Sequence, residues 1–208
     1  MLDVANSTTW NILHKLRRAM IRAEREKLGP VVEIDETFIG GVEKGKPGRG
    51  AEKKSLVVVA VELDADMKKV GRIRLATIPN ASSDSLLPFI AKNVEPGSKV
   101  LTDGWQGYAS LKIKGYHHIV KTIKNGQDIL PHAHLVFSLL KRWLDGTFQG
   151  ATKKYYLDFY LDEYVFRFNR RKSKSRGKLF GRLMEQSVMT PPVTRRELRV
   201  KNHGFADG

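Results

Sequence analysis

The sequence predicts an α/β fold with a mixed central sheet flanked by helices. Apolar stretches of strand length lie at 31–39, 55–63 and 70–78, and shorter ones follow at 98–102 and 116–120. Stretches with helical periodicity stand between and after them, and there is no internal repeat. Three strands, a helix, a strand, a helix, a strand and further helices form the order of an α/β layout.

The composition narrows the class of protein. The chain has 208 residues, 41% of them hydrophobic, which suits one good-sized domain with an appendage. No apolar run approaches the roughly 20 residues of a membrane span, and the start lacks the features of a signal peptide. Because there is no cysteine, disulfides and thiolate zinc sites are excluded. We expect a cytoplasmic protein without a membrane partner.

The charge points to an anionic partner. Lys and Arg total 37 against 22 Asp and Glu, a formal net charge of +15. Nucleic acid is the first candidate, and anionic lipid is the alternative. A lipid-binding protein more often concentrates its charge in one amphipathic helix or a tail beside an anchor. Here basic residues run from Lys15 to Lys201, which favours a long phosphate backbone.

The first element is predicted to be a helix over 8–28, ended by Gly29-Pro30. Its apolar positions are Trp10, Leu13, Leu16 and Met20. Two interpretations stay open. The basic helix could enter a DNA groove, or it could be a solvated helix that docks on the main domain.

The strand after this helix carries a carboxylate in its middle. Alternation puts Glu33, Asp35 and Thr37 on one face and the apolar side chains on the other. Burying a carboxylate costs on the order of several kcal/mol unless it is paired or holds a metal. A half-exposed strand whose polar face meets water is the alternative.

A second carboxylate, Asp103, ends the fourth predicted strand and is followed by glycine, where α/β sheets place ligand sites. In the ribonuclease H-like version of this layout, the first strand is central and the fourth lies beside it. Asp35 and Asp103 would then be neighbours. Two such carboxylates can hold Mg²⁺ or Mn²⁺ for phosphoryl transfer.

A third ligand would come from a later helix that faces the sheet. The helix predicted from about His134 to Leu144, after a loop at 124–133, places His134 and Lys141 on one polar face. A lone histidine without a metal is the alternative, and His132 is close enough to compete.

The next predicted helix, 153–170, repeats this pattern with Glu163, Arg167 and Arg170 on one face. An ion pair on a solvated face is the alternative. The helix is apolar nearly all round, however, which favours burial and partners such as DNA phosphate and a metal centre. A basic, irregular remainder follows, with one more helix near 178–188.

Four stretches together resemble one known family. VEIDETFIGG, TDGWQGY, LPHAHLVFSLLKRWLDGTFQGA and YLDEYVFRFNRR are similar, in this order, to the ISXO-like group of DDE-superfamily insertion-sequence transposases. The resemblance runs from about Thr9 to Val193. It implies a ribonuclease H-like catalytic domain, a divalent metal, and DNA strand cleavage and transfer at element ends. It also implies a bacterial protein that associates with the nucleoid.

The resemblance also implies residue roles. Asp35 and Asp103 are the two aspartates of the metal triad, and His134, rather than His132, stands at the variable third position, with Lys141 at the basic residue seven positions on. Glu163 opens the Glu-Arg-Arg signature, with catalytic involvement expected but its role open. The expected DNA-binding residues are Lys141, Arg142, Arg167, Arg170 and Arg171.

The chain departs from the group at its start. Members usually begin with a Cys-rich zinc ribbon and a full helix-turn-helix, whereas ANSTTWNILHKLRRAM resembles only the end of the latter. We therefore expect a helix-turn-helix remnant at 1–29, a catalytic domain at 30–172 and a basic extension at 173–208. A truncated copy and a homo-oligomeric synaptic complex are further expectations.

The sequence is compatible with three functions. The first is a DDE-type DNA transposase with Mg²⁺ or Mn²⁺. The second is a non-catalytic DNA-binding protein derived from a transposase, and the third is a nuclease on the same fold. Retention of the metal triad favours the transposase.

Overall fold

The computed structural model describes residues 3–22, 24–40, 54–122, 128–148 and 154–200. It divides into two compact units. The sheet unit is the single segment Glu26–Lys154, and the helical unit combines Met1–Arg25 with Tyr155–Gly208. The sheet unit is thus inserted in the sequence between the two segments that form the helical unit.

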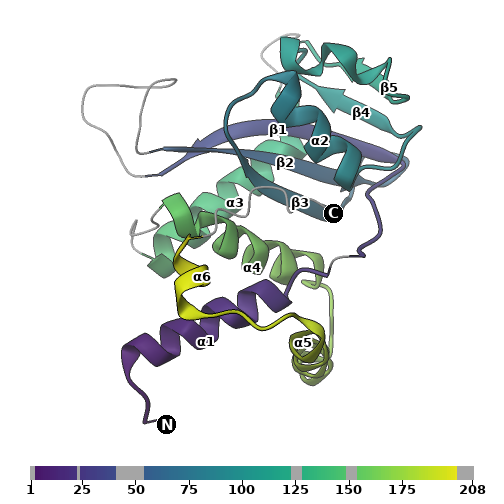
Figure 1. The fold of residues 1–208 in the computed structure, drawn as a ribbon. Helices are drawn as coiled ribbons and strands as arrows, with labels where there is room; N and C mark the ends of the chain where they lie inside the picture. The colour runs from purple at the N-terminus through teal and green to yellow at the C-terminus, as the bar shows by residue number, and fades with distance from the viewer. Residues whose placement is uncertain (1–2, 23, 41–53, 123–127, 149–153, 201–208) are drawn as a thin grey trace. The chain divides into compact units, whose positions relative to one another are not determined.

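The sheet unit holds a five-stranded mixed sheet in the order β3-β2-β1-β4-β5 (Figure 1). β1, β2 and β3 form an antiparallel meander, and β4 and β5 run parallel to β1. This order and these directions make the fold ribonuclease H-like, so the predicted fold class is confirmed. The strands are β1 (Val31–Ile39), β2 (Ser55–Leu63), β3 (Val70–Ile78), β4 (Lys99–Thr102) and β5 (His117–Val120).

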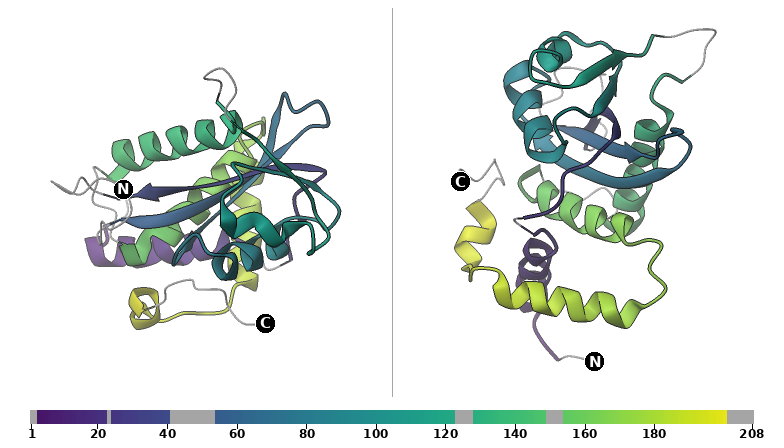
Figure 2. Two further views of the ribbon diagram at one scale, coloured as in Figure 1. Left: turned by 90° about the horizontal axis from the view of Figure 1, so that it is seen from above. Right: turned by 90° about the vertical axis from the view of Figure 1, so that its right-hand side faces the viewer.

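Helices cover the two faces of this sheet (Figure 2). One face packs its apolar side chains against α2 (Ser83–Asn93) and the 3-10 helix η1 (Gln106–Leu111). The other face carries α3 (Pro131–Phe148), which contacts β1 and β2. Consequently β2, between its neighbours and under both layers, is buried along almost its whole length, as its continuous apolar run predicted.

The start of α3 differs from the prediction, which placed a loop through residue 133. The helix begins at Pro131, because proline is well suited to a first helical turn, where its missing N–H costs nothing. The predicted polar face is confirmed, since His134, Ser138 and Lys141 are all exposed. Residues 124–127 of the predicted loop lie outside the described residues.

The helical unit consists of helices from both ends of the chain. α1 contacts α4, α5 and α6, and it lies between α4 and α5 (Figures 1 and 2). The short 3-10 helix η2 (Lys154–Tyr156) stands where the chain enters this unit for the second time. The α-helices are α1 (Asn6–Ala19), α4 (Leu157–Asn169), α5 (Arg176–Met189) and α6 (Arg195–Val200). The predicted irregular tail therefore contains α6, while residues 201–208 lie outside the described part.

The helix predicted over 8–28 was wrong at its end, because α1 stops at Ala19. Leu28 instead forms a parallel bridge with Val94, and its N–H donates to the carbonyl of Asn93, so tertiary pairing overrides helix propensity there. The predicted apolar stripe was also wrong in part. Leu13 is 44% exposed, whereas His14 and Arg17 are buried.

His14 is enclosed by aromatic rings within the helical unit. Its ring stacks on Trp10 with centroids 4.0 Å apart and meets Phe159 and Tyr160 of α4 edge-on. Burial lowers the pKa of His14 to about 4, and the charge of Arg17 acts in the same direction. The imidazole is therefore neutral at pH 7.

No helix in the described ranges is long and apolar enough to cross a membrane. The predicted domains at 1–29, 30–172 and 173–208 concern function and origin rather than packing, so they stay a prediction.

Candidate metal centre

The polar face of β1 meets the start and middle of α3 through successive pairs of side chains. Glu33 pairs with His132, Asp35 with His134, and Thr37 accepts a hydrogen bond from Lys141 Nζ at 3.1 Å. Strand alternation brings 33, 35 and 37 to one face, and all three partners come from one helix. The site is therefore fixed by how α3 lies across β1.

Glu33 anchors the N-terminus of α3. Its Oε2 accepts hydrogen bonds from the backbone N–H groups of His132 and Ala133, at 3.0 and 2.9 Å, and its Oε1 lies 2.8 Å from His132 Nδ1. First-turn N–H groups have no partner inside a helix, and a carboxylate there also meets the positive end of the helix dipole. Glu33 thus positions the turn that carries His134.

His134 lies between two carboxylates. Its Nε2 is 3.2 Å from Asp35 Oδ2, and its Nδ1 is 2.7 Å from Asp128 Oδ1. A carboxylate on one imidazole nitrogen fixes the ring and its tautomer, which is how metal-binding histidines are commonly oriented. Asp128 therefore directs Nε2 of His134 toward Asp35.

Asp35 is largely removed from water and sits near a like charge. Burial raises the pKa of Asp35 above its usual value, and the charge of Asp103 adds to this effect. A hydrogen bond from the Glu36 backbone and the nearby His134 oppose it. Because Asp35 and Asp103 are like charges and Asp35 is largely buried, a positive charge bound between them would be stabilised.

Asp103 is held in a tight turn after β4. Its Oδ1 accepts a hydrogen bond from the Trp105 N–H at 2.9 Å. Gly104 has φ +84°, and a Cβ there would lie 2.5 Å from Val120 Cγ1, so any other residue would strain the backbone and force Val120 to move. The Asp-Gly pair of the sequence thus reflects both a backbone conformation and a close approach.

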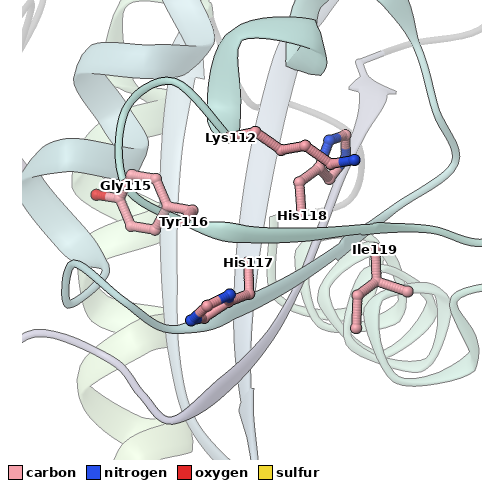
Figure 3. A pocket seen from close by; sticks show the side chains of 6 residues that line it. All are labelled: Lys112, Gly115, Tyr116, His117, His118 and Ile119. Atoms are coloured by element: carbon pink, nitrogen blue, oxygen red, sulfur yellow. The ribbon is translucent and has the colours of Figure 1, made fainter.

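The strand that presents Asp103 is braced from β5. His118 Nε2 lies 2.8 Å from Thr102 Oγ1, which also accepts the Gly104 N–H at 3.2 Å. Figure 3 shows His118 and Lys112 on one side of β5, along an open groove of about 430 Å³. Burial, together with the charge of Lys112, lowers the pKa of His118. The groove lies on the far side of β4 from β1.

A buried tyrosine contacts a carboxylate of β1. The Tyr108 hydroxyl donates a hydrogen bond of 2.5 Å to Glu36 Oε2, linking η1 to β1. Burial raises the pKa of Tyr108 well above its usual value, and the charges of Glu36, Asp35 and Asp103 add to this. Tyr108 therefore stays protonated beside the carboxylates and donates to one of them.

The donor set suits a hard divalent cation. Asp35 and Asp103 offer carboxylate oxygens and His134 an imidazole nitrogen, ligands that Mg²⁺ and Mn²⁺ accept. Within the described ranges, no three His, Asp or Glu side chains already form a ligand group. A cation would nonetheless offset the burial and the Asp103 charge that raise the Asp35 pKa, so the residues present fit the group.

The predicted Glu-Arg-Arg residues lie in the helical unit. Glu163 is buried and receives Arg17 Nε at 2.7 Å and Arg167 Nη2 at 2.7 Å, one on each carboxylate oxygen. The i,i+4 ion pair of the alternative interpretation is thus present, but its Glu163 is buried rather than solvated, and Arg17 of α1 is an additional partner. In this structure Glu163 positions two arginines.

The remaining predicted DNA-binding residues are cationic and accessible in different degrees. Lys141 and Arg142 are exposed on α3. The guanidinium of Arg170 stacks on the Phe166 ring at 3.8 Å, and that of Arg171 stacks on Phe168 at 4.1 Å. Stacking on a ring orients each guanidinium group and leaves its positive charge unneutralised.

Four residues of this architecture were not predicted from the sequence. They are Arg17, Tyr108, Asp128 and Glu33 in its capping role. The pairing of Asp128 with His134 could hardly be predicted, because the only local cue was a carboxylate shortly before the first turn of α3. The Tyr of TDGWQGY was the one clue to Tyr108.

Comparison with known proteins decides the family. The ISXO2-like transposase domain matches residues 27–169, more than half of the chain. The chain belongs to the ISXO2-like transposase domain family. The match covers the whole described sheet and α4, so it contains three of the four stretches that suggested the resemblance and most of the fourth.

The other comparisons give less information about this transposase domain. No curated protein matches it. A chain in the cryo-EM structure of the simian T-cell lymphotropic virus intasome in complex with PP2A regulatory subunit B56 gamma is 16% identical, with a TM-score of 0.46. That similarity covers 84% of this chain and 64% of the other. The ribonuclease H-like fold follows here from the strand order.

Proposed function

We propose that this transposase domain is a DDE-type transposase that cleaves DNA strands with Mg²⁺ or Mn²⁺ and joins them to target DNA. The observation that carries the proposal is the pairing of Asp35 with His134 at 3.2 Å, with the charge of Asp103 reaching Asp35, in a member of this family. The strongly basic chain supports DNA as the partner.

Asp35, Asp103 and His134 would hold the divalent ion, and Asp128 would orient His134. The bound ion supplies Lewis acidity and charge stabilisation to phosphoryl transfer. Lys141, fixed by Thr37, lies two helical turns from His134 and offers its charge to a phosphate of the bound strand. The burial of Asp35 limits the screening of its own charge by water.

The cations of the helical unit have a binding role in this proposal. Arg167, Arg170 and Arg171 would contact DNA phosphates, and Glu163 acts through Arg17 and Arg167 rather than on the substrate. The full reaction on two element ends would need more than one copy of the chain.

Replacing the metal ligands tests the enzymatic part. Asp35→Asn or Asp103→Asn should abolish Mg²⁺-dependent nicking of supercoiled plasmid, a loss of at least about a hundredfold, because the ion loses its charged ligand. DNA affinity in EDTA should remain within about twofold, since an exposed phosphate-binding surface is unchanged.

Asp66→Asn is the matched control, because Asp66 is an exposed carboxylate in the same unit. It should nick plasmid like the unaltered protein. Nicking that survives in either ligand variant would disprove the site assignment.

A non-catalytic DNA-binding protein is the second candidate. It is favoured by the engagement of both His134 nitrogens with Asp35 and Asp128, which could stabilise the fold without a metal. Mn²⁺ titration followed by NMR separates the two functions. Paramagnetic broadening centred on His134, Asp35 and Asp103 supports the metal site, whereas unchanged His134 signals at millimolar Mn²⁺ support the binder.

A further inference from the structure

The sheet of the sheet unit has an open edge at β5. The strand order leaves one side of β5 without a neighbouring strand in the described part of the chain. The His117 N–H donates to the Ser98 carbonyl, toward β4, and backbone groups alternate between the two sides of a strand, so those of His118 and Val120 face outward. The His118 N–H donates to the nearby Tyr116 carbonyl at 3.1 Å. The outward carbonyls and the Val120 N–H can therefore pair with a further strand.

The opposite edge of the sheet is built differently. β3 carries Arg72 and Arg74 inside the strand, and charged side chains within an edge strand commonly prevent pairing with another chain. Both guanidinium groups also donate to backbone carbonyls of the segment just before β1, so another part of the chain already contacts β3. β5 has no Lys, Arg, Asp or Glu within the strand, and its Ile119 and Val120 side chains are 41% and 48% exposed. β5 is thus the edge suited to pairing.

The surroundings of this open edge are basic. The segment 112–121, KIKGYHHIVK, contains three lysines and two histidines and no carboxylate. Lys112 is exposed, as is Lys99, the register partner of His117 on β4. A groove of about 430 Å³ lies at this strand, with Lys112 and His118 on one side of β5 and His117 on the other (Figure 3). Charge complementarity therefore favours an occupant with negative side chains.

Two other occupants fit this edge less well. A second copy of β5 would bring two basic segments together, and like charges opposed across a strand pair are destabilising. A nucleic acid strand would neutralise the lysines, but its backbone has no N–H groups to meet the outward carbonyls of His118 and Val120. An extended peptide offers backbone donors and acceptors in alternation, and carboxylate side chains add the complementary charge.

We propose that the outer edge of β5 binds an extended acidic peptide of a partner protein, which adds to the sheet as a further strand. Backbone hydrogen bonds give this contact its affinity, and the flanking lysines give it a preference for carboxylates. The contact is separate from DNA cleavage and joining, because the proposed function does not use the outer edge of β5.

The probe for this edge is a fluorescein-labelled hexapeptide of alternating glutamate and valine, measured by anisotropy in EDTA without DNA. Ile119→Glu should weaken its binding at least about tenfold, because a like charge enters the pairing edge. Ile113→Glu is the matched control, since Ile113 is 88% exposed in the same basic segment but precedes the strand. It should weaken binding by less than about threefold, because exposed charges are screened. Equal losses in the two variants would mean that charge alone holds the peptide, and would overturn the proposal.

A second measurement uses the unaltered protein, so it does not depend on how a variant folds. Saturating peptide should slow hydrogen exchange of the Val120 amide at least about tenfold, whereas the Ile119 amide, which already faces β4, should change little. A hexapeptide of alternating glutamate and proline has the same charge but lacks the N–H groups of the replaced valines, and it should bind at least about tenfold more weakly. Equal binding of the two peptides, or an unchanged Val120 amide, contradicts strand addition.

The other occupants are outcomes of the same exchange measurement. Slowing of the Val120 amide by oligothymidylate to the same extent would assign the edge to nucleic acid. Slowing that increases with protein concentration alone would assign it to a second copy. Either result overturns the proposal.

The result is separable from that of the proposed function. Asp35→Asn should bind the peptide within about twofold of the unaltered protein, since Asp35 lies on β1 and β4 stands between β1 and β5. If the peptide binds but the unaltered protein does not nick plasmid with Mg²⁺, the peptide site stands and the enzymatic proposal fails. If nicking is present and the peptide leaves the Val120 amide unchanged, the enzymatic proposal stands and the peptide site fails.

Discussion

At the residue scale, substituting Tyr108 tests how its hydrogen bond stabilises the contact between η1 and β1. Tyr108→Phe removes the hydroxyl that donates to Glu36 and leaves the ring in place. The lost hydrogen bond to a charged, half-buried group should lower the free energy of unfolding by about 1–3 kcal/mol in urea denaturation. Tyr155→Phe, at a 42% exposed tyrosine, is the control and should change it by less than about 0.5 kcal/mol. Equal effects would show that Tyr108 has no bracing role.

Single residues also mark where sequence reasoning succeeds and fails. Asp35 was predictable, because a carboxylate in an apolar strand is costly and therefore conspicuous. Asp128 and Arg17 were not, because their partners are distant in the sequence or stand in another element. Long-range ion pairs leave no periodicity to detect, so neither residue differed from an ordinary surface charge.

At the scale of the element, α3 depends on an acceptor that β1 provides. Glu33→Gln keeps the size of the side chain but removes the charge that meets two N–H groups and His132. We expect the free energy of unfolding to fall by about 1–3 kcal/mol, because first-turn donors lose a charged acceptor. Chemical denaturation measures this loss.

The same variant should also disturb the position of His134, two residues along the helix. Mn²⁺ affinity, followed by the NMR signals of His134, should therefore fall together with stability. Glu95→Gln removes an exposed charge from the same unit and should alter neither quantity appreciably. Intact Mn²⁺ affinity in Glu33→Gln would show that the cap does not position His134.

Elements were predicted well where periodicity was strong. The bounds of β2 and β3 match the apolar and alternating stretches, because strand period and burial coincide there. α1 was overextended, since residues 20–28 contain good helix formers and no breaker before Gly29. The pairing of Leu28 with Val94 decided that segment, and no local rule contains that contact.

At the scale of the whole molecule, the two units should respond differently to acid. The pKa of His14 is lowered to about 4 in the folded state, so the unfolded chain takes up a proton first as pH falls below 6.5. Stability of the helical unit should decrease between pH 6.5 and about 4, by at most ~3 kcal/mol, and change no further below that range. Above pH 6.5 the effect is absent.

Hydrogen exchange resolves this prediction by unit. Amides of α1 and α4 should lose protection at pH 5 relative to pH 7, after correction for intrinsic rates, more than those of β1 and β2. His14→Gln should reduce this pH dependence, and His117→Gln, an exposed histidine of the sheet unit, should leave it intact. A uniform response of both units would contradict the role of His14.

The overall fold was predictable because the order of strands and helices admits few topologies. Placing the first strand beside the fourth brought Asp35 and Asp103 together correctly, as their charge interaction shows. The division into two units was not predictable in the same way. Nothing in the local pattern of α1 indicated that its buried side would meet α4, near the other end of the chain.

The joining of both chain ends in one unit has a consequence for biosynthesis. Arg17 and its partner Glu163 are separated by 146 positions, so α1 leaves the ribosome long before α4 exists. At the usual 5–20 residues per second, that wait is about 7–30 s. During it, Trp10, His14 and Arg17 lack the surface that encloses them, while the sheet unit is being completed. The nascent α1 is thus a natural client for chaperones, and premature termination before α4 leaves it permanently exposed.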